Sequence, residues 1–173
     1  MNLKIRIMKK LSTILAAAVV VIGFSNTYAQ STASADASAR IVSPLQITKT
    51  ADLAFGNIAA GPSAGTVDMD INDVRTSTGG VTLIAAGNVS NAAAFDIIGY
   101  PDATFTISMP SSILISFGAN DMAVDNFVSS LGATSALDAQ GESALKVGAT
   151  LNVDANQPVG LYTGAFDVTV AYN

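Results

Sequence analysis

The side chains able to do acid–base or metal chemistry in this sequence are almost all aspartates. The chain has no His, no Cys and no Trp, which excludes Ser-His-Asp and Cys-His nucleophiles and metal sites built on thiolate or imidazole. Glu142 is the sole glutamate, and the aspartates stand singly in turns or on polar strand faces. Glycoside hydrolysis by two carboxylates is therefore not indicated. We expect no catalytic residue and no cofactor.

One acidic cluster comprises Asp68, Asp70, Asn72 and Asp73 and is similar to the opening of a calcium loop. A calcium loop of the helix–loop–helix type needs a glycine at its sixth position and a bidentate glutamate at its twelfth. Asp73 stands at the glycine position and Gly79 at the glutamate position. We therefore expect no metal ion here and interpret the first three residues as the outward face of a strand.

The first 29 residues have the three parts of a secretory signal peptide. Four basic residues at positions 4–10 precede an apolar run over residues 11–24, and the segment ends on the small residue Ala29. We expect a signal helix over residues 1–29, cleavage between Ala29 and Gln30, and secretion to the periplasm, the cell surface or the medium. The run falls short of the roughly 20 residues of a spanning helix, so we expect no membrane insertion after signal removal. An N-terminal membrane anchor is the alternative.

Residues 30–173 have the length of a single domain. Four of the eight basic residues precede Gln30, so this region carries four cations against 13 acids, a net charge of −9. Four scattered cations offer no patch that could hold phosphates, and we therefore expect no nucleic-acid partner. The negative charge favours solubility of a secreted protein.

Strict alternation of apolar and polar residues predicts several β-strands after residue 30. The strands are expected around residues 67–71, 95–98, 105–109, 145–153 and 166–172. Turns are expected at Gly61-Pro62, Gly79-Gly80, Gly99-Tyr100-Pro101, Met109-Pro110 and Gln157-Pro158-Val159-Gly160. Short strands at this spacing predict an all-β fold, an antiparallel sandwich.

The C-terminal residues 160–173 resemble the closing strand of chaperone–usher pilus subunits. Tyr172 is the penultimate residue, Gly160 is the fourteenth from the end, and apolar residues alternate between them. The stretch 53–58 resembles an early strand of the spore-coat-protein-U-like relatives of these pilins.

Residues 30–173 as a whole are similar to a family of uncharacterised secreted bacterial domains of the same adhesin group. The motifs that carry this resemblance are Pro44-Leu45-Gln46-Ile47, Leu53-Ala54-Phe55-Gly56, Arg75 with Gly79-Gly80-Val81, and Leu137-Asp138-Ala139-Gln140-Gly141. The family is poorly characterised, so the motifs indicate membership and leave the function open.

The resemblance implies an immunoglobulin-like fold and a fibre-forming or adhesive surface role. Pilins of this kind lack one strand, which a periplasmic chaperone and then the N-terminal extension of a like subunit supply. The resemblance places the strand used in chaperone binding and assembly at Gly160, Phe166, Val168, Val170 and Tyr172. The candidate donor strand presents Ala33, Ala35, Ala37, Ala39 and Ile41.

The candidate donor has an alternative interpretation as the protein's own first strand. Alanines fill pockets poorly, because each missing methylene gives up about 0.8 kcal/mol of burial. The disulfide common in pilins is also absent. The alternative is a self-complete, monomeric β-sandwich that binds a glycan or a protein, in which Tyr100 and Tyr162 would be free to stack on a sugar.

Overall fold

The computed structural model describes residues 30–87 and 89–173. Residues 41–173 form one compact unit, and the described residues 30–40 belong to a separate unit. The signal peptide over residues 1–29 lies outside the described residues, so the signal and its cleavage stay predictions. No helix long and apolar enough to cross a membrane is found among the described residues.

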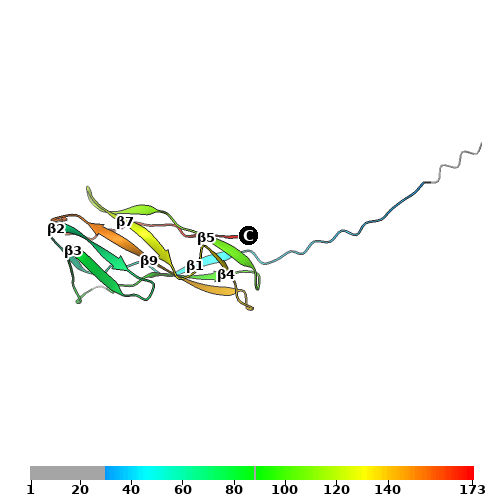
Figure 1. Cartoon of the computed structure of the whole chain (residues 1–173), viewed down its shortest axis with the longest axis horizontal. Helices are drawn as coiled ribbons and strands as arrows, with labels where there is room; N and C mark the ends of the chain where they lie inside the picture. Colours follow the sequence, from blue (N-terminus) through cyan, green and yellow to red (C-terminus); the bar gives the residue numbers. More distant parts are fainter. Residues whose placement is uncertain (1–29, 88) are drawn as a thin grey trace, which may run out of the picture. The chain divides into compact units, whose positions relative to one another are not determined.

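The compact unit is built from antiparallel strands (Figure 1). They are β1 (Gln46–Ala51), β2 (Ile58–Met69), β3 (Arg75–Leu83), β4 (Ala93–Ile98), β5 (Thr104–Ser108), β6 (Ser112–Phe117), β7 (Asn120–Ser129), β8 (Thr134–Ala136), β9 (Glu142–Val153) and β10 (Thr169–Tyr172). Seven of them form one sheet, and β10, β5 and β8 form a second sheet in that order. The predicted all-β antiparallel sandwich is confirmed.

The strand β9 is the centre of the larger sheet. Its first half pairs with β4 and its second half with β2. Leu151 stands opposite both Val67 of β2 and Val124 of β7, so β2 and β7 lie on opposite sides of β9. Beyond these neighbours, β1 pairs with β4, β3 with β2, and β6 with β7.

Two clusters of buried side chains fill the domain. The first core cluster surrounds Leu151 and includes Val67 and Val124. The second core cluster surrounds Phe105, which is fully buried, and includes Ile97. Half-buried residues of the C-terminal segment pack against the second cluster, namely Phe166, Val168, Val170 and Tyr172. One face of the C-terminal segment therefore packs against the core, as the alternation of its apolar and polar residues indicates.

Two of the predicted turns are wrong. Gly61-Pro62 lies inside β2 and Gly79-Gly80 inside β3. The two strands approach each other so closely here that a Cβ on Gly80 would lie 2.1 Å from the carbonyl oxygen of Ser63. These glycines permit close approach of two strand backbones at an irregularity in the pairing and do not reverse the chain.

Candidate functional site

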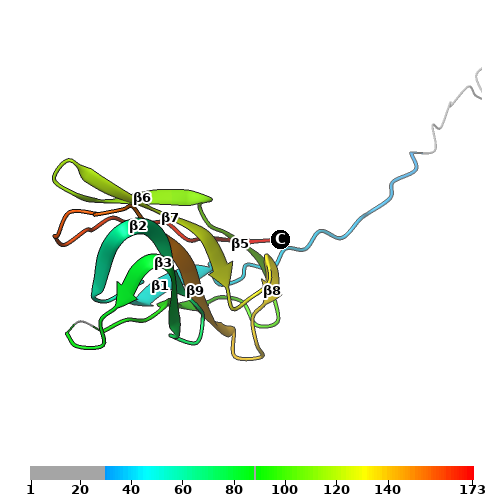
Figure 2. The ribbon, with the colours of Figure 1, turned by 60° about the vertical axis from the view of Figure 1, so that its left-hand side comes forward.

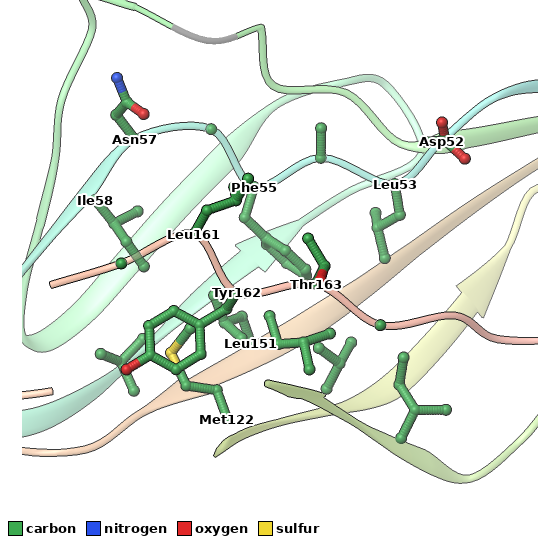
Figure 3. Close-up of a pocket in the computed structure, with 18 of the residues that line it drawn as sticks. Asp52, Leu53, Phe55, Asn57, Ile58, Met122, Leu151, Leu161, Tyr162 and Thr163 are labelled. Carbon is green, nitrogen blue, oxygen red and sulfur yellow. The ribbon is translucent and has the colours of Figure 1, made fainter. Parts of the chain in front are cut away.

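A cavity of about 730 Å³ opens between two segments that are far apart in the sequence. Residues 52–60, between β1 and the first residues of β2, form the first wall, and residues 157–166, which lead toward β10, form the second wall. The floor consists of apolar side chains from β6, β7 and β9: Ile113, Ile115, Met122, Val124, Leu151 and Val153 (Figure 3). We call this cavity the groove.

Arg75 holds the first wall in place. Its guanidinium donates hydrogen bonds to the carbonyl oxygens of Phe55 (2.6 Å), Asn57 (3.1 Å) and Ile84 (2.6 Å). The guanidinium of an arginine often binds a carboxylate, but here its N–H groups bind three backbone carbonyls instead. Gly56 lies against this fork with a φ of 67°, and a Cβ there would be 2.8 Å from Arg75 Nη1. The first wall is therefore shaped by one side chain more than by strand pairing.

Among the described residues, backbone hydrogen bonds attach the second wall to β6 at one point. Thr163 and Ser116 exchange two backbone hydrogen bonds, of 2.9 and 3.1 Å, and the segment before β10 runs alongside β6 (Figure 2). The Phe117 ring covers Gly160, where a Cβ would lie 2.2 Å from the ring, and its centroid is 5.8 Å from that of Tyr162. A few side-chain contacts and one bridge thus fix the second wall.

The two walls are joined at one end of the groove and are separate along its length. At that end the Asn156 N–H donates to the Gly61 carbonyl (2.8 Å); Gly61 directly follows the first wall, and Asn156 directly precedes the second wall. Among the described residues, no backbone hydrogen bond joins residues 52–60 to residues 157–166. Along the groove, the two walls are therefore not joined through their backbones.

The mouth of the groove is apolar. Val89, Val159 and Leu161 line it and are 76%, 98% and 72% exposed. Leu53 and Phe55 extend from the first wall toward the second wall (Figure 3). Exposed apolar side chains around a groove are typical of a surface that binds another molecule.

The sequence pattern of one protein family matches residues 45–172; it is described as a domain of unknown function, DUF4402. The chain belongs to this family. The matched region begins just before β1 and ends with β10, so the DUF4402 domain contains both walls and the floor of the groove, while residues 30–44 precede it. Among curated proteins and among solved structures, none matches the chain.

The DUF4402 domain brings only part of the predicted assembly strand to the groove. Gly160 and Phe166 line it. Val168, Val170 and Tyr172 lie beyond it, half-buried against the second core cluster. The predicted strand over residues 166–172 is also shorter than expected, because β10 begins at Thr169.

The predicted donor residues all lie in the segment that precedes the DUF4402 domain. Residues 30–44 are exposed and belong to no strand, and Ile41 is 98% exposed. The structure therefore leaves the five predicted residues, Ala33, Ala35, Ala37, Ala39 and Ile41, outside the domain's own sheets. The alternative expectation was that these residues form the protein's own first strand. In the structure the first strand, β1, begins later, at Gln46.

Tyr172 has a structural role that the sequence does not reveal. Its hydroxyl accepts a hydrogen bond from the Tyr100 N–H (2.6 Å) and donates one to the Ser43 carbonyl (3.0 Å). Gly99 has no room for a side chain here, since a Cβ would lie 2.3 Å from this hydroxyl. The last strand is thereby tied to the residue at which the N-terminal segment enters the domain.

Tyr162 is not a free ring, which contradicts the expectation of a sugar-stacking position there. It is half-buried in the second wall, where its hydroxyl donates to the Pro158 carbonyl (2.9 Å) and accepts from Gln157 Nε2 (3.0 Å). Phe117 covers part of the ring. Tyr100 is half-buried beside the β4–β5 turn.

In the acidic cluster, the carboxylates of Asp70 and Asp73 accept hydrogen bonds from other groups of the protein. The Asp70 carboxylate accepts from the N–H groups of Val74 and Asn72, both at 2.8 Å, and the bond from Val74 is the main cause that lowers the pKa of Asp70. Lys146 Nζ donates to Asp73 Oδ2 (2.6 Å) and is the main cause that lowers the pKa of that carboxyl. The described residues hold no group of three or more His, Cys, Asp or Glu placed to bind a metal ion. These acids shape the β2–β3 turn.

The sequence singled out the second wall only in part, through Gly160 and Phe166 of the predicted assembly strand, and interpreted residues 157–160 as a turn. Arg75 and the stretch 53–58 appeared only as parts of the resemblance to known families. The first wall lacks the period-two alternation that marks a paired strand, so no strand was predicted there.

Proposed function

We propose that this protein is a non-enzymatic, secreted structural or adhesive surface subunit whose copies join by strand addition. In this proposal, residues 33–41 of one copy lie in the groove of another copy. The observation that carries it is the gap between the two walls, which have apolar side chains below them and no backbone hydrogen bonds across them among the described residues. An added strand supplies both kinds of partner.

The N-terminal segment has the length and the pattern that the groove requires. Nine residues at about 3.4 Å each give a strand of roughly 30 Å, and the second wall is ten residues long. Apolar side chains at positions 33, 35, 37, 39 and 41 would all point to one face. That face meets the floor, while Asp36, Ser38 and Arg40 face water.

The proposal also includes a chaperone, which would cover the groove until another subunit binds. An empty apolar groove exposes side chains such as Val159 and Leu161, and such surfaces promote aggregation until they are covered. A periplasmic chaperone would fill the groove with a strand of its own before a second subunit replaces it. The C-terminal resemblance to chaperone–usher pilins supports this part of the proposal.

The test uses the secreted protein that begins at Gln30 and a variant that lacks residues 30–41. We expect the intact protein to form chains of increasing length with concentration, and the truncated variant to stay monomeric and folded. A synthetic peptide of residues 30–43 should bind the truncated variant and raise its melting temperature. A peptide of the same composition with the alternation scrambled is the control.

Two outcomes would overturn the proposal. If the intact protein is a monomer at every concentration and ignores the peptide, the self-complete sandwich that binds a glycan or another protein is correct. If the truncated variant cannot fold with or without the peptide, residues 30–41 act within their own molecule.

A further inference from the structure

The first wall has few backbone acceptors left for an added strand. Ala54 exchanges two backbone hydrogen bonds with Asn91 (2.8 and 2.9 Å), and the Asp52 carbonyl accepts from Asn91 Nδ2 (2.7 Å). Two further carbonyls of this wall accept from Arg75. Neither Asn91 nor Arg75 is among the residues that line the groove. Four of the six carbonyls of residues 52–57 are therefore directed at partners outside the groove.

The second wall offers backbone groups that the molecule itself does not use. Thr163 exchanges two backbone hydrogen bonds with Ser116, so its N–H and C=O point toward β6. Successive residues of an extended chain direct these groups to opposite sides, so Tyr162 and Gly164 direct theirs away from β6. Both residues line the groove, and within the described part of the chain neither makes a backbone-to-backbone hydrogen bond.

We propose that the strand bound in the groove pairs through its backbone with the second wall alone, and that Tyr162 and Gly164 are its main-chain partners. This inference rests on the proposed function, because the bound strand is the donor segment of another copy, residues 33–41. The first wall contributes side-chain contact, from residues such as Leu53 and Phe55 (Figure 3). Alternate residues of the donor segment then have no backbone partner, and water reaches their N–H groups through the mouth of the groove.

Pairing on one edge weakens the hold of the groove on the donor segment. A strand inserted between two partners makes main-chain hydrogen bonds along both of its edges, whereas a strand paired on one edge makes about half as many. The donor segment therefore leaves the groove more readily than a fully inserted strand would. Chain length then follows the concentration of subunits.

The first experiment measures the binding of donor peptides to the intact protein, diluted below the concentration at which chains form. An ester in place of an amide removes one N–H donor and adds no bulk. One peptide of residues 30–43 has esters in place of the N–H groups of Ala35 and Ala37, and its matched control has them in place of those of Asp36 and Ser38. Because adjacent residues direct their N–H groups to opposite edges of a strand, we expect the two peptides to differ in affinity by roughly tenfold or more. The weaker peptide identifies the edge that faces the second wall.

The second experiment identifies the paired wall by hydrogen exchange at single amides. With the all-amide peptide bound, the N–H groups of Tyr162 and Gly164 should exchange on the order of tenfold more slowly than without it. The N–H groups of Leu53 and Phe55 are the control on the first wall. Their exchange should change by less than about threefold, because no strand pairs with them.

The outcomes separate this inference from the proposed function on which it rests. If the all-amide peptide binds and the two ester peptides have equal affinities, the strand is paired on both edges or on neither, and the inference is wrong while strand addition stands. Slower exchange at Leu53 and Phe55, or unchanged exchange at Tyr162 and Gly164, has the same meaning. If the all-amide peptide does not bind, strand addition and the inference are both wrong.

Discussion

Replacing Tyr172 by Phe removes one hydroxyl and keeps the ring that packs against the second core cluster. The hydroxyl takes part in two hydrogen bonds, one from the Tyr100 N–H and one to the Ser43 carbonyl. A net contribution of about 0.5–1.5 kcal/mol for each bond gives a loss of roughly 1–3 kcal/mol in the free energy of unfolding. For a domain of this size, each kcal/mol corresponds to about 4 °C in Tm.

Urea unfolding of Tyr172→Phe measures this loss as a lower midpoint at an unchanged m value. Tyr162→Phe is the matched control, because its hydroxyl also makes two hydrogen bonds, to residues only four and five positions away. Those partners stay close in the unfolded chain, and we expect a loss below about 1 kcal/mol. Hydrogen exchange should also accelerate in β1 for Tyr172→Phe alone, since Ser43 lies just ahead of that strand.

The reasoning fails if the two Tyr→Phe variants have the same stability. A Tyr172→Phe variant within about 0.5 kcal/mol of the unchanged protein would show that water replaces the hydroxyl without loss. A changed m value would instead indicate that the variant alters the compactness of the unfolded state, and the stability difference would then not measure the two bonds.

Three further predictions concern the acidic turn, the first wall and the central strand. In the folded protein, the pKa values of Asp70 and Asp73 lie below the ordinary value of 3.8. The two ionised carboxylates therefore stabilise the fold fully above pH 3.8, and this stabilisation is lost as the pH falls through their lower, folded pKa values. In an acid titration, the Asp73→Asn variant should lose less stability than the unchanged protein. Arg75→Lys should lower stability by roughly 1–3 kcal/mol and speed hydrogen exchange in residues 54–58, because one ammonium cannot reach three carbonyls; unchanged exchange there would contradict this role. Gly148→Ala places a Cβ 2.2 Å from the Met69 carbonyl oxygen, and urea unfolding should show a loss of about 1–3 kcal/mol.

The alternation of apolar and polar residues correctly predicted the strands that bury one face and expose the other. In β9, Leu145, Val147, Ala149, Leu151 and Val153 are all buried, and the expected strand over 145–153 lies within Glu142–Val153. The strand expected at 95–98 is part of β4 for the same reason. A period of two survives wherever one face of a strand meets a core and the other meets water.

The sequence failed where backbone geometry or a single side chain decides the structure. Gly79-Gly80 has the composition of a turn, and only the approach of β2 shows why a strand needs glycine there. The role of Arg75 depends on carbonyls 18 and 20 residues away in the sequence. No local pattern encodes such contacts, so the first wall of the groove was missed.

An alanine-rich donor would be a weak occupant of a pocket that needs bulky side chains, so a groove that accepts it must supply most of the apolar surface itself. Its bulk already comes from the walls and floor, with Leu53, Phe55 and Tyr162 among the lining residues. What the groove lacks is backbone: residues 159–162 and 164–168 of the described chain make no backbone-to-backbone hydrogen bonds.

On the first wall, the carbonyls of Phe55 and Asn57 are already taken by Arg75. An added strand would therefore form its hydrogen bonds mainly with the second wall. Its affinity would come from main-chain bonds, with small side chains that let the strand lie close to the floor. Under the proposed strand addition, this division of roles would answer the objection that alanines bury too little surface, because the receiving subunit would supply the apolar surface and the donor would supply the strand.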